Sequence, residues 1–284
     1  MFSVGDGGIA VEVTGLVKSF RRERRGRPWR RRPGGGELQR AIDRVDMSVR
    51  DGEMVAIVGL NGSGKSTLLR VLATLTLPDS GSARVFGRDV VAEGGEVRRH
   101  VNRVSVEASF FKEMSPWENL SYATRLYGRG GRGTRAAAIA ALTRLGLPRD
   151  TIDRPMKQLS RGQQQKVAIA RSLLTSPSLL LMDEPTTGLD PRSKREVQGF
   201  VRDIRRQSGV TVLLSTHDLD EAERLCDRVI VLDHGRILAE GTPHELRAEH
   251  ATAGDGATLE DVFLRLTGKS FDDDTEPGAG EEAS

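Results

Sequence analysis

The chain has 284 residues, of which 37% are hydrophobic and 29% charged, and its formal net charge is +3. This length allows one large or two modest domains with a buried core, and the composition is ordinary for a globular protein. No run of about 18 apolar residues occurs, which excludes a readable transmembrane helix, and we expect no secretory signal at the N-terminus. The single cysteine, Cys226, excludes an internal disulfide and fits a reducing cytosol, and we expect it to be buried in a helix.

The small net charge hides an asymmetry along the chain. Residues 21–40 hold nine arginines against two glutamates, whereas residues 271–284 hold six acidic residues and no basic one. We predict that the second stretch is a disordered, solvated tail. The first is either a solvated basic loop or a patch that contacts acidic membrane headgroups. A basic run also binds nucleic-acid backbones, but without specificity, so we expect no specific nucleic acid as a partner.

In chain order, strands are predicted over residues 9–17 and 45–49, on either side of the basic insertion. A continuous apolar run then fits a buried parallel strand, and a helix follows from about residue 65 to residue 75. That apolar run is residues 54–58, and further buried strands are expected at residues 179–182, 210–214 and 228–232. Helical stretches separate most of these strands, which predicts a parallel sheet covered by helices.

The middle of the chain, about 108–176, has a mostly helical pattern that includes residues 134–145. Two helix starts are well marked. Asp190 supplies an N-cap before the proline at position 191, and residues 258–261 form a capping box with aspartate in the usual glutamate place.

Residues 59–67, GLNGSGKST, match the phosphate-binding pattern G-x-x-x-x-G-K-[ST] between a predicted strand and a predicted helix. Glycines let backbone N–H groups point at a phosphate, and the helix N-terminus adds its positive dipole end. Lys65 is placed to reach the β- and γ-phosphates, and the Ser66 hydroxyl to ligate Mg²⁺. The pattern predicts nucleotide binding, with candidate residues Gly59, Asn61, Gly62, Ser63, Gly64, Lys65, Ser66 and Thr67.

Three further side chains follow buried strands. Asp183 ends the strand LLLMD and is placed to hold Mg²⁺. Glu184, one residue later, is a candidate to accept a proton from an attacking water. His217 follows the strand at 210–214, at the same edge of the sheet, so we expect it to contact the γ-phosphate.

These motifs together resemble the nucleotide-binding subunits of ABC transporters over nearly the whole globular length. The most specific element is LSRGQ at residues 159–163, similar to the family's LSGGQ signature with Arg161 in place of a glycine. QQKVAIARSLL after it, GLD at 188–190 and STHD at 215–218 also match. The resemblance implies a P-loop NTPase fold, α/β, with a RecA-like parallel-sheet core, an antiparallel β subdomain and an inserted α-helical signature subdomain.

The resemblance also implies the domain limits and the cofactors. Residues 9–268 would form the nucleotide-binding domain, which includes the basic loop at 21–40 and the helical subdomain at about 108–176. The disordered acidic tail, residues 269–284, would follow the domain. ATP and Mg²⁺ would be the cofactors. Glu184 and His217 would be the catalytic residues for ATP hydrolysis, and Phe20 would stack on adenine. Ser160, Gly162 and Gln163 would bind the γ-phosphate held by another subunit, and Asp190 would belong to the same site. A second ATPase subunit, in a homo- or heterodimer, is therefore expected.

One position departs from the family pattern. A glutamine is expected after the strand that enters the helical region, but counting back from residues 118–119 places Val106 there. Valine cannot ligate Mg²⁺. We hypothesise that Glu107 replaces the glutamine as a metal ligand because the backbone leaves the strand at this point.

The resemblance further implies a transmembrane permease subunit on a separate chain and a location at the cytoplasmic face of the cell membrane. Phe110, Phe111 and Trp117 are either contacts of that permease or core of the helical region. The stretches 72–90 and 259–268 resemble ABC-2-type exporter ATPases of the daunorubicin-resistance kind, which favours export. The alternatives are an importer ATPase subunit, or an ABC-type ATPase that acts on nucleic acid or a protein complex without a membrane partner.

Overall fold

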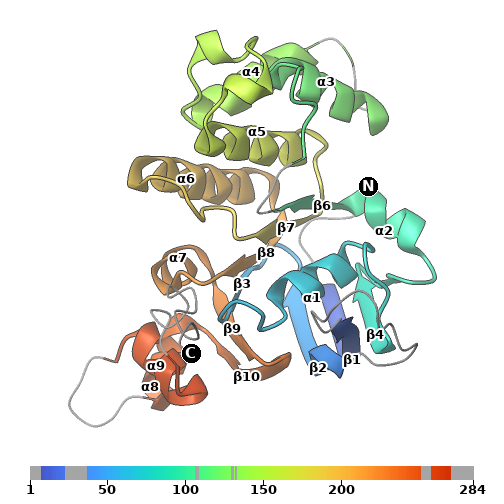
Figure 1. Ribbon diagram of the computed structural model, residues 1–284, viewed down its shortest axis with the longest axis vertical. Helices are drawn as coiled ribbons and strands as arrows, with labels where there is room; N and C mark the ends of the chain where they lie inside the picture. The colour runs from blue at the N-terminus through green and yellow to red at the C-terminus, as the bar shows by residue number, and fades with distance from the viewer. Residues whose placement is uncertain are drawn as a thin grey trace, which may run out of the picture.

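The computed structural model describes residues 8–22, 37–105, 109–128, 131, 133–250 and 257–269. Its core contains two sheets (Figure 1). The larger has six strands in the order β10-β9-β3-β8-β7-β6, and all neighbours are parallel except β10 and β9. Its strands are β3 (Met54–Val58), β6 (Val101–Val104), β7 (Leu179–Asp183), β8 (Thr211–Thr216), β9 (Arg228–Asp233) and β10 (Arg236–Gly241).

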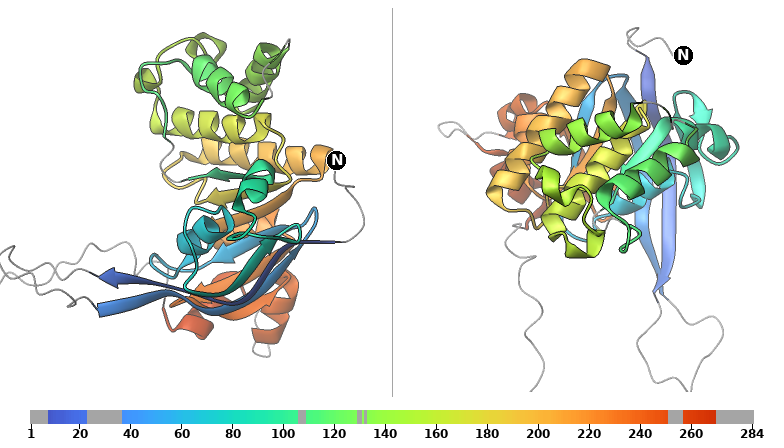
Figure 2. Two further views of the ribbon diagram at one scale, coloured as in Figure 1. Left: turned by 90° about the vertical axis from the view of Figure 1, so that its right-hand side faces the viewer. Right: turned by 90° about the horizontal axis from the view of Figure 1, so that it is seen from above.

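The smaller sheet is antiparallel, in the order β2-β1-β4-β5. Its strands are β1 (Ile9–Arg22), β2 (Glu37–Arg50), β4 (Ser80–Val85) and β5 (Arg88–Asp89). The prediction of a basic loop over 21–40 is wrong at both ends, because Phe20 pairs with Gln39 and Arg21 with Leu38 in a continuous ladder. Cross-strand pairing overrides the arginine-rich composition here. Figure 2 shows this long hairpin projecting from the body.

The central parallel strands separate two apolar cores. Side chains alternate across a strand, so Met54 and Val58 of β3 face one core while Val55 and Ile57 face the other. The first core contains residues of α5 (Arg161–Leu174) and α6 (Pro191–Ser208), and the second contains those of α1 (Lys65–Leu72) and the antiparallel sheet. The predicted parallel sheet covered by helices is confirmed, with the helices on both faces.

A layer of helices lies beyond α6 at the β6 end of the larger sheet (Figure 1). It consists of α3 (Pro116–Leu126), α4 (Thr134–Arg144) and α5; α5 contacts β6, and two short 3₁₀ turns lie between α4 and α5. Ser115 begins α3 and Ser160 begins α5, each in a capping box that supplies partners to otherwise unpaired N–H groups. The helical pattern predicted for this region is confirmed, and α4 matches the expected helix at 134–145 to within a residue.

The remaining helices complete the two ends of the molecule. They are α2 (Gly94–His100), α7 (Leu219–Leu225), α8 (Pro243–His250) and α9 (Leu259–Thr267). The predicted caps Asp190 of α6 and Thr258 of α9 are both present, and Cys226 is buried, at the end of α7 rather than within it. Among the described residues, no helix is long and apolar enough to cross a lipid bilayer. Residues 23–36 and the acidic tail lie outside the described ranges.

Candidate nucleotide-binding site

The loop between β3 and α1 is shaped by two glycines that no other residue could replace without a shift. A Cβ on Gly59 would lie 2.2 Å from the Leu232 carbonyl oxygen of β9. A Cβ on Gly64 would lie 2.2 Å from the Ala41 carbonyl oxygen, and its φ of +112° is one that L side chains rarely adopt. These close approaches set the loop against β9 and β2 and leave its inner side open.

That inner side is a cavity of about 230 Å³, hereafter the loop cavity. Its lining includes most of the predicted nucleotide-binding residues of the loop, together with Phe20 and Glu184. The exposed Phe20 ring reaches the cavity because β1 runs several residues past its pairing with β4, and its side chain is 44% exposed. The lining residues are Phe20, Gln39, Ala41, Asn61, Gly62, Ser63, Gly64, Lys65, Ser66, Thr67 and Glu184.

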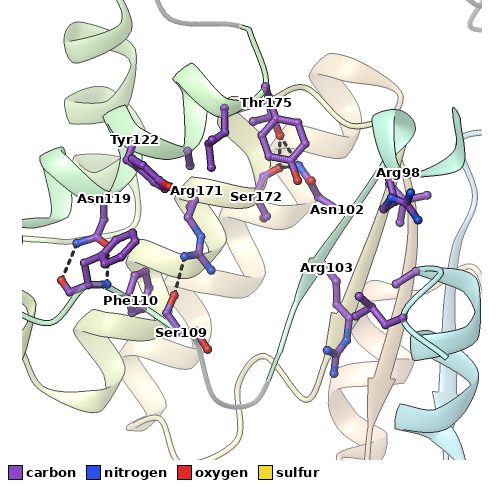
Figure 3. Close-up of a pocket in the computed structure, with 17 residues that line it drawn as sticks. Arg98, Asn102, Arg103, Ser109, Phe110, Asn119, Tyr122, Arg171, Ser172 and Thr175 are labelled. Atoms are coloured by element: carbon purple, nitrogen blue, oxygen red, sulfur yellow. Dashed lines mark hydrogen bonds between the residues drawn. The ribbon is translucent and has the colours of Figure 1, made fainter. Parts of the chain in front are cut away.

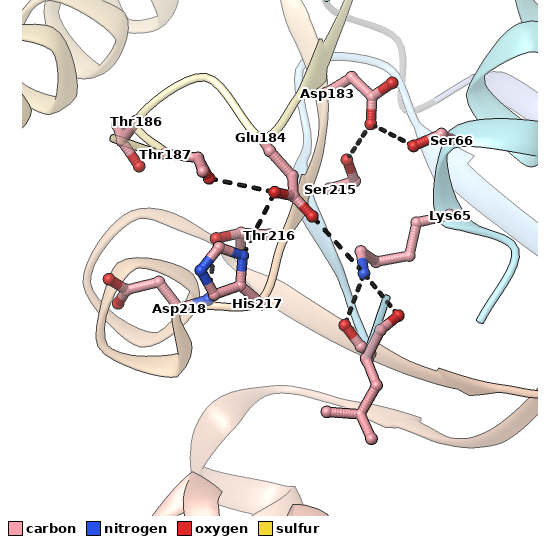
Figure 4. Close-up of polar contacts among 12 residues, drawn as sticks. Lys65, Ser66, Asp183, Glu184, Thr186, Thr187, Ser215, Thr216, His217 and Asp218 are labelled. Atoms are coloured by element: carbon pink, nitrogen blue, oxygen red, sulfur yellow. Dashed lines mark hydrogen bonds and ion pairs between the residues drawn. The ribbon is translucent and has the colours of Figure 1, made fainter. Parts of the chain in front are cut away.

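Lys65 is buried within this loop (Figure 4). Its Nζ donates to the carbonyl oxygen of Gly59 at 2.5 Å and of Leu60 at 3.0 Å, and it lies 3.7 Å from Oε1 of Glu184. A buried ammonium group needs such partners to offset its lost hydration. The cation is thus held at the floor of the loop cavity, facing a carboxylate from the end of β7.

Asp183, the last residue of β7, is almost fully buried and accepts hydrogen bonds on both carboxylate oxygens. Ser66 Oγ and Ser215 Oγ each donate to Oδ1 at 2.8 Å, and Arg103 Nη2 donates to Oδ2 at 2.6 Å. The predicted neighbours Ser66 and Asp183 are therefore in direct contact. Ser215 and Arg103 were not among the predicted site residues.

Glu184 leaves the strand in an unusual conformation, with φ at +46°. Non-glycine residues in this left-handed region are uncommon and are found at functional sites, where the surroundings hold them. Its backbone N–H donates to the Ser215 carbonyl oxygen at 3.0 Å, and its Oε2 accepts from Thr187 Oγ1 at 3.1 Å. The turn aims the carboxylate at Lys65 and His217 (Figure 4), on the other side of the chain from Asp183.

Nδ1 of His217 lies 3.3 Å from Oε2 of Glu184. The hydrogen bond from His217 lowers the pKa of Glu184 despite its burial, and the charge of Lys65 lowers it further. The same hydrogen bond raises the pKa of His217 above its ordinary 6.5. The imidazole is 44% exposed, so it is both ordered by Glu184 and open to a ligand.

A buried carboxylate, Glu221 of α7, ties together the loops after β7 and β8. Its Oε1 accepts from Thr186 Oγ1 at 2.9 Å and Gln198 Nε2 at 3.2 Å, and its Oε2 accepts from Thr216 Oγ1 at 2.9 Å. Burial raises the pKa of Glu221. Thr216 directly precedes His217, so this network fixes the loop that carries the histidine.

The residues present fit a nucleotide with Mg²⁺. The Ser66 hydroxyl and the Asp183 carboxylate are hard oxygen ligands 2.8 Å apart at the edge of the loop cavity. Among the described residues no three histidine, cysteine or acidic side chains gather to hold a metal ion. A hydroxyl and one carboxylate match Mg²⁺, which keeps waters and takes its remaining ligands from phosphates, rather than a metal held in a protein cage.

Several predicted site residues are not in the lining of the loop cavity: Gly59, Asp183 and His217, which lie next to lining residues or contact them, and Ser160, Gly162, Gln163 and Asp190. Ser160 and Gln163 bond each other in the capping box of α5, whose first turn remains partly exposed. Asp190 accepts from the backbone of Ser193 and Arg192, and the bond from Ser193 lowers the pKa of its carboxyl group. Val106 and Glu107 lie outside the described residues.

A second cavity, of about 530 Å³, lies between the helical layer and the β6 edge of the sheet (Figure 3). We call it the aromatic cavity, because Phe110, Phe111, Tyr122 and Tyr127 line it. Phe111 is 53% exposed and packs edge-on against Tyr122. Trp117 is not part of this lining; Trp117 and Phe110 are both partly buried and pack against the first apolar core.

Comparison with known proteins identifies the chain at the level of family. The family model described as ABC transporter matches residues 42–187. The daunorubicin/doxorubicin resistance ATP-binding protein of Streptomyces peucetius is 42% identical over 84% of this chain and 67% of its own length. The chain belongs to the ABC transporter family. As an ATPase of this family, it binds ATP and hydrolyses it to power transport.

Other members of the ABC transporter family match over similar lengths. The Nod factor export ATP-binding protein I of Rhizobium sp. is 36% identical over 85% of this chain and 74% of its own. The sulfate/thiosulfate import ATP-binding protein of Rhodopseudomonas palustris is 38% identical over 86% and 66% respectively. A dimeric ATP-binding cassette, MJ0796 in a post-hydrolysis state with ADP and Pi, superposes with a TM-score of 0.72 at 27% identity, covering 82% of this chain and 98% of the other. The predicted P-loop NTPase fold is confirmed.

Proposed function

We propose that the chain hydrolyses Mg²⁺·ATP at the loop cavity and thereby drives export through a separate membrane-spanning permease. The observation that carries the proposal is the convergence of Lys65, Glu184 and His217 within 3.7 Å contacts at the end of the loop cavity. A cation for the phosphates, a carboxylate for the attacking water and an imidazole that contacts this carboxylate are parts suited to phosphoryl transfer to water.

The nucleotide would lie along the loop cavity. Phe20 offers an exposed ring for the adenine, at the rim formed by the end of the β1–β2 hairpin. The backbone of residues 61–67, at the start of α1, faces the β-phosphate. Lys65 would exchange its bonds to the Gly59 and Leu60 carbonyl oxygens for bonds to the β- and γ-phosphates.

Ser66 and Asp183 would hold Mg²⁺ with the nucleotide phosphates. When bound, the ion neutralises charge on the phosphate oxygens. Glu107 stays our proposal for a further ligand in place of the family's glutamine. Substitution of Glu107 by alanine would then weaken Mg²⁺-dependent turnover, and unchanged turnover would reject the assignment.

Glu184 is the proposed general base. Its lowered pKa keeps it ionised near neutral pH, so the carboxylate is ready to accept a proton from the attacking water. His217 holds this carboxylate through Nδ1 and is exposed enough for Nε2 to meet the γ-phosphate. Thr187 fixes the other side of the same oxygen.

A second ATPase subunit would complete each site. The first turn of α5, with Ser160, Gly162 and Gln163, lies outside the loop cavity and is partly exposed, so it is free to meet a phosphate held by another chain. The dimeric structures of the similar cassette MJ0796 support this arrangement. Asp190 would act at the same interface by ordering the loop before α6.

The aromatic cavity is the proposed docking site of the permease, at the cytoplasmic face of the membrane. Its exposed aromatic lining suits an apolar segment of a partner. Export is favoured over import because the drug-resistance relative of Streptomyces peucetius is more similar than the sulfate importer. Residues 9–268 would act as one nucleotide-binding domain, with the helical subdomain at about 108–176.

Co-expression with a candidate membrane permease tests the proposal. We expect the chain to co-purify with membranes, and inverted vesicles to take up fluorescent doxorubicin with ATP but not with the non-hydrolysable analogue AMP-PNP. A Phe111→Asp variant should stay out of the membrane fraction, whereas Leu238→Asp, an exposed apolar residue on β10, should behave as the wild type. ATP-independent uptake, or equal recruitment of both variants, would contradict the proposal.

A further inference from the structure

Arg103 joins the proposed metal site to the aromatic cavity. It lies on β6, the edge strand of the parallel sheet, where its Cα pairs with that of Leu181 on β7. From there its side chain, 17% exposed, reaches past the end of β7 so that Nη2 lies 2.6 Å from Oδ2 of Asp183. The stem of the same side chain lines the aromatic cavity (Figure 3).

The ion pair saturates a carboxylate that a metal ion would need. Oδ1 of Asp183 already accepts from Ser66 and Ser215, and Oδ2 accepts from Arg103. The Asp183 side chain is only 2% exposed, so in the absence of a metal ion its charge requires a partner within the protein. Arg103 supplies that positive charge.

A divalent cation bound to the Asp183 carboxylate would be repelled by the Arg103 guanidinium, which lies 2.6 Å from Oδ2 of the same carboxylate. A cation between Ser66 and Asp183 would lie beside the guanidinium, where two positive charges a few ångströms apart repel through partly buried surroundings. Ser66 would also redirect its hydroxyl from Oδ1 to the ion. Metal binding at Ser66 and Asp183 would therefore compete with the contact between Arg103 and Asp183.

The guanidinium has a place to go. Its Nε is buried and has no acceptor among the described residues, so the group is not fully satisfied where it lies. On its other side lies the aromatic cavity, of about 530 Å³, with Asn102 and Ser109 as polar neighbours and with Arg98 and Arg171 also in its lining. A short swing about the side-chain torsions would take the charge away from Asp183 toward Asn102 and Ser109, and the two other arginines keep this position less favourable than the ion pair.

We propose that Arg103 is a positioning residue that acts as a displaceable counter-ion of Asp183, competing with Mg²⁺ for the carboxylate and moving into the aromatic cavity when the metal binds. The inference rests on the proposed function, in which Asp183 holds Mg²⁺. Arg103 therefore stabilises the chain when no metal ion is bound, and it weakens metal binding at Asp183. Binding of the metal ion and movement of the Arg103 charge toward the aromatic cavity then occur together.

Manganese binding tests the competition directly. The full chain is titrated with Mn²⁺ in the presence of AMP-PNP, and free Mn²⁺ is followed by electron paramagnetic resonance. We expect Arg103→Gln to tighten Mn²⁺ binding about tenfold, the scale of one charge-assisted hydrogen bond. Without metal, the same variant should unfold at a lower temperature than the wild type, and Mn²⁺·AMP-PNP should remove most of that difference.

Two matched variants keep the test decisive. Arg103→Lys retains the charge but not the planar fork, so its Mn²⁺ affinity should fall between those of the wild type and Arg103→Gln. Arg98→Gln removes another cavity-lining arginine, one that bonds Thr74 and not Asp183, and should leave Mn²⁺ affinity within about twofold. If both Arg103 variants bind Mn²⁺ no more tightly than the wild type, this inference is overturned and the proposed function is not affected. Failure of the wild type to bind Mn²⁺·AMP-PNP would instead reject the proposed function and this inference with it.

Discussion

Oε2 of Glu184 lies 3.3 Å from Nδ1 of His217, and the two residues come from the ends of adjacent strands, β7 and β8. The contact changes the proton affinity of both partners in the directions expected for an ion pair: the pKa of Glu184 is lowered and that of His217 is raised. The pair is therefore charged over a wider pH range than either residue would be alone.

The first prediction concerns this pH range. In wild-type protein, the His217 ring should titrate above its ordinary pKa of 6.5, and in Glu184→Gln the value should fall. The contact between protonated His217 and Glu184 contributes fully to the stability of the folded chain below pH 6.5. This contribution is lost as the pH rises through the raised pKa of His217. Histidine NMR titration measures the shift, with His100 as internal reference because burial, not Glu184, lowers its pKa. An unchanged His217 titration would show that the contact does not persist in solution.

The second prediction concerns the glycines of the loop. Gly64→Ala should lower the free energy of unfolding by about 1–2 kcal/mol from its positive φ alone, and more from the clash with the Ala41 carbonyl oxygen. Gly199→Ala is the matched control, because no atom lies near its would-be Cβ and it sits within α6. That variant should gain about 0.5–1 kcal/mol. Urea unfolding measures both, and equal effects would contradict the account of the loop.

The third prediction concerns Glu221. Glu221→Ala leaves the hydroxyls of Thr186 and Thr216 without their buried acceptor, which should cost about 2–4 kcal/mol of stability. Glu221→Gln keeps one acceptor oxygen and should cost less. Because Thr216 precedes His217, ATP turnover should fall more in the alanine variant than in the glutamine variant. Equal stability of the two variants in urea would show that the network does not order this loop.

The fourth prediction concerns the dimer. Glu184→Gln should bind ATP without turnover and form a dimer in light scattering, whereas ADP should leave it monomeric. Adding Arg161→Glu places a negative charge beside the first turn of α5 and should prevent the dimer. Lys157→Glu, an exposed change on the 3₁₀ turn just before α5, is its control and should still dimerise. A dimer that survives Arg161→Glu would contradict the proposed role of α5.

Local patterns were enough to predict the phosphate-binding loop, the acids after β7, His217 and several helix caps. Each depends on residues close together in sequence, where glycine, strand-end and capping chemistry act directly. Phe20 was predicted from the family resemblance instead, and the long β1–β2 pairing brings its ring to the cavity.

Contacts between distant segments were not predictable in the same way. Arg103 precedes Asp183 by 80 positions, and only the parallel register of β6 and β7 brings them together. An arginine near the end of a strand carries no signal of its partner. The extension of the β1–β2 hairpin was not predicted for a related reason. Its arginine-rich composition does not indicate a strand, and the strand forms because of pairs between the two strands.

The rate of ATP hydrolysis by Glu184→Gln decides whether Glu184 is the general base. Single-turnover hydrolysis of Mg²⁺·ATP is measured for the wild type, for Glu184→Gln and for Glu12→Gln, a change at a half-exposed glutamate on β1. We expect normal turnover in Glu12→Gln, whereas Glu184→Gln should bind the nucleotide and hydrolyse it at least about 100-fold more slowly. Wild-type turnover in Glu184→Gln would rule out this role of Glu184.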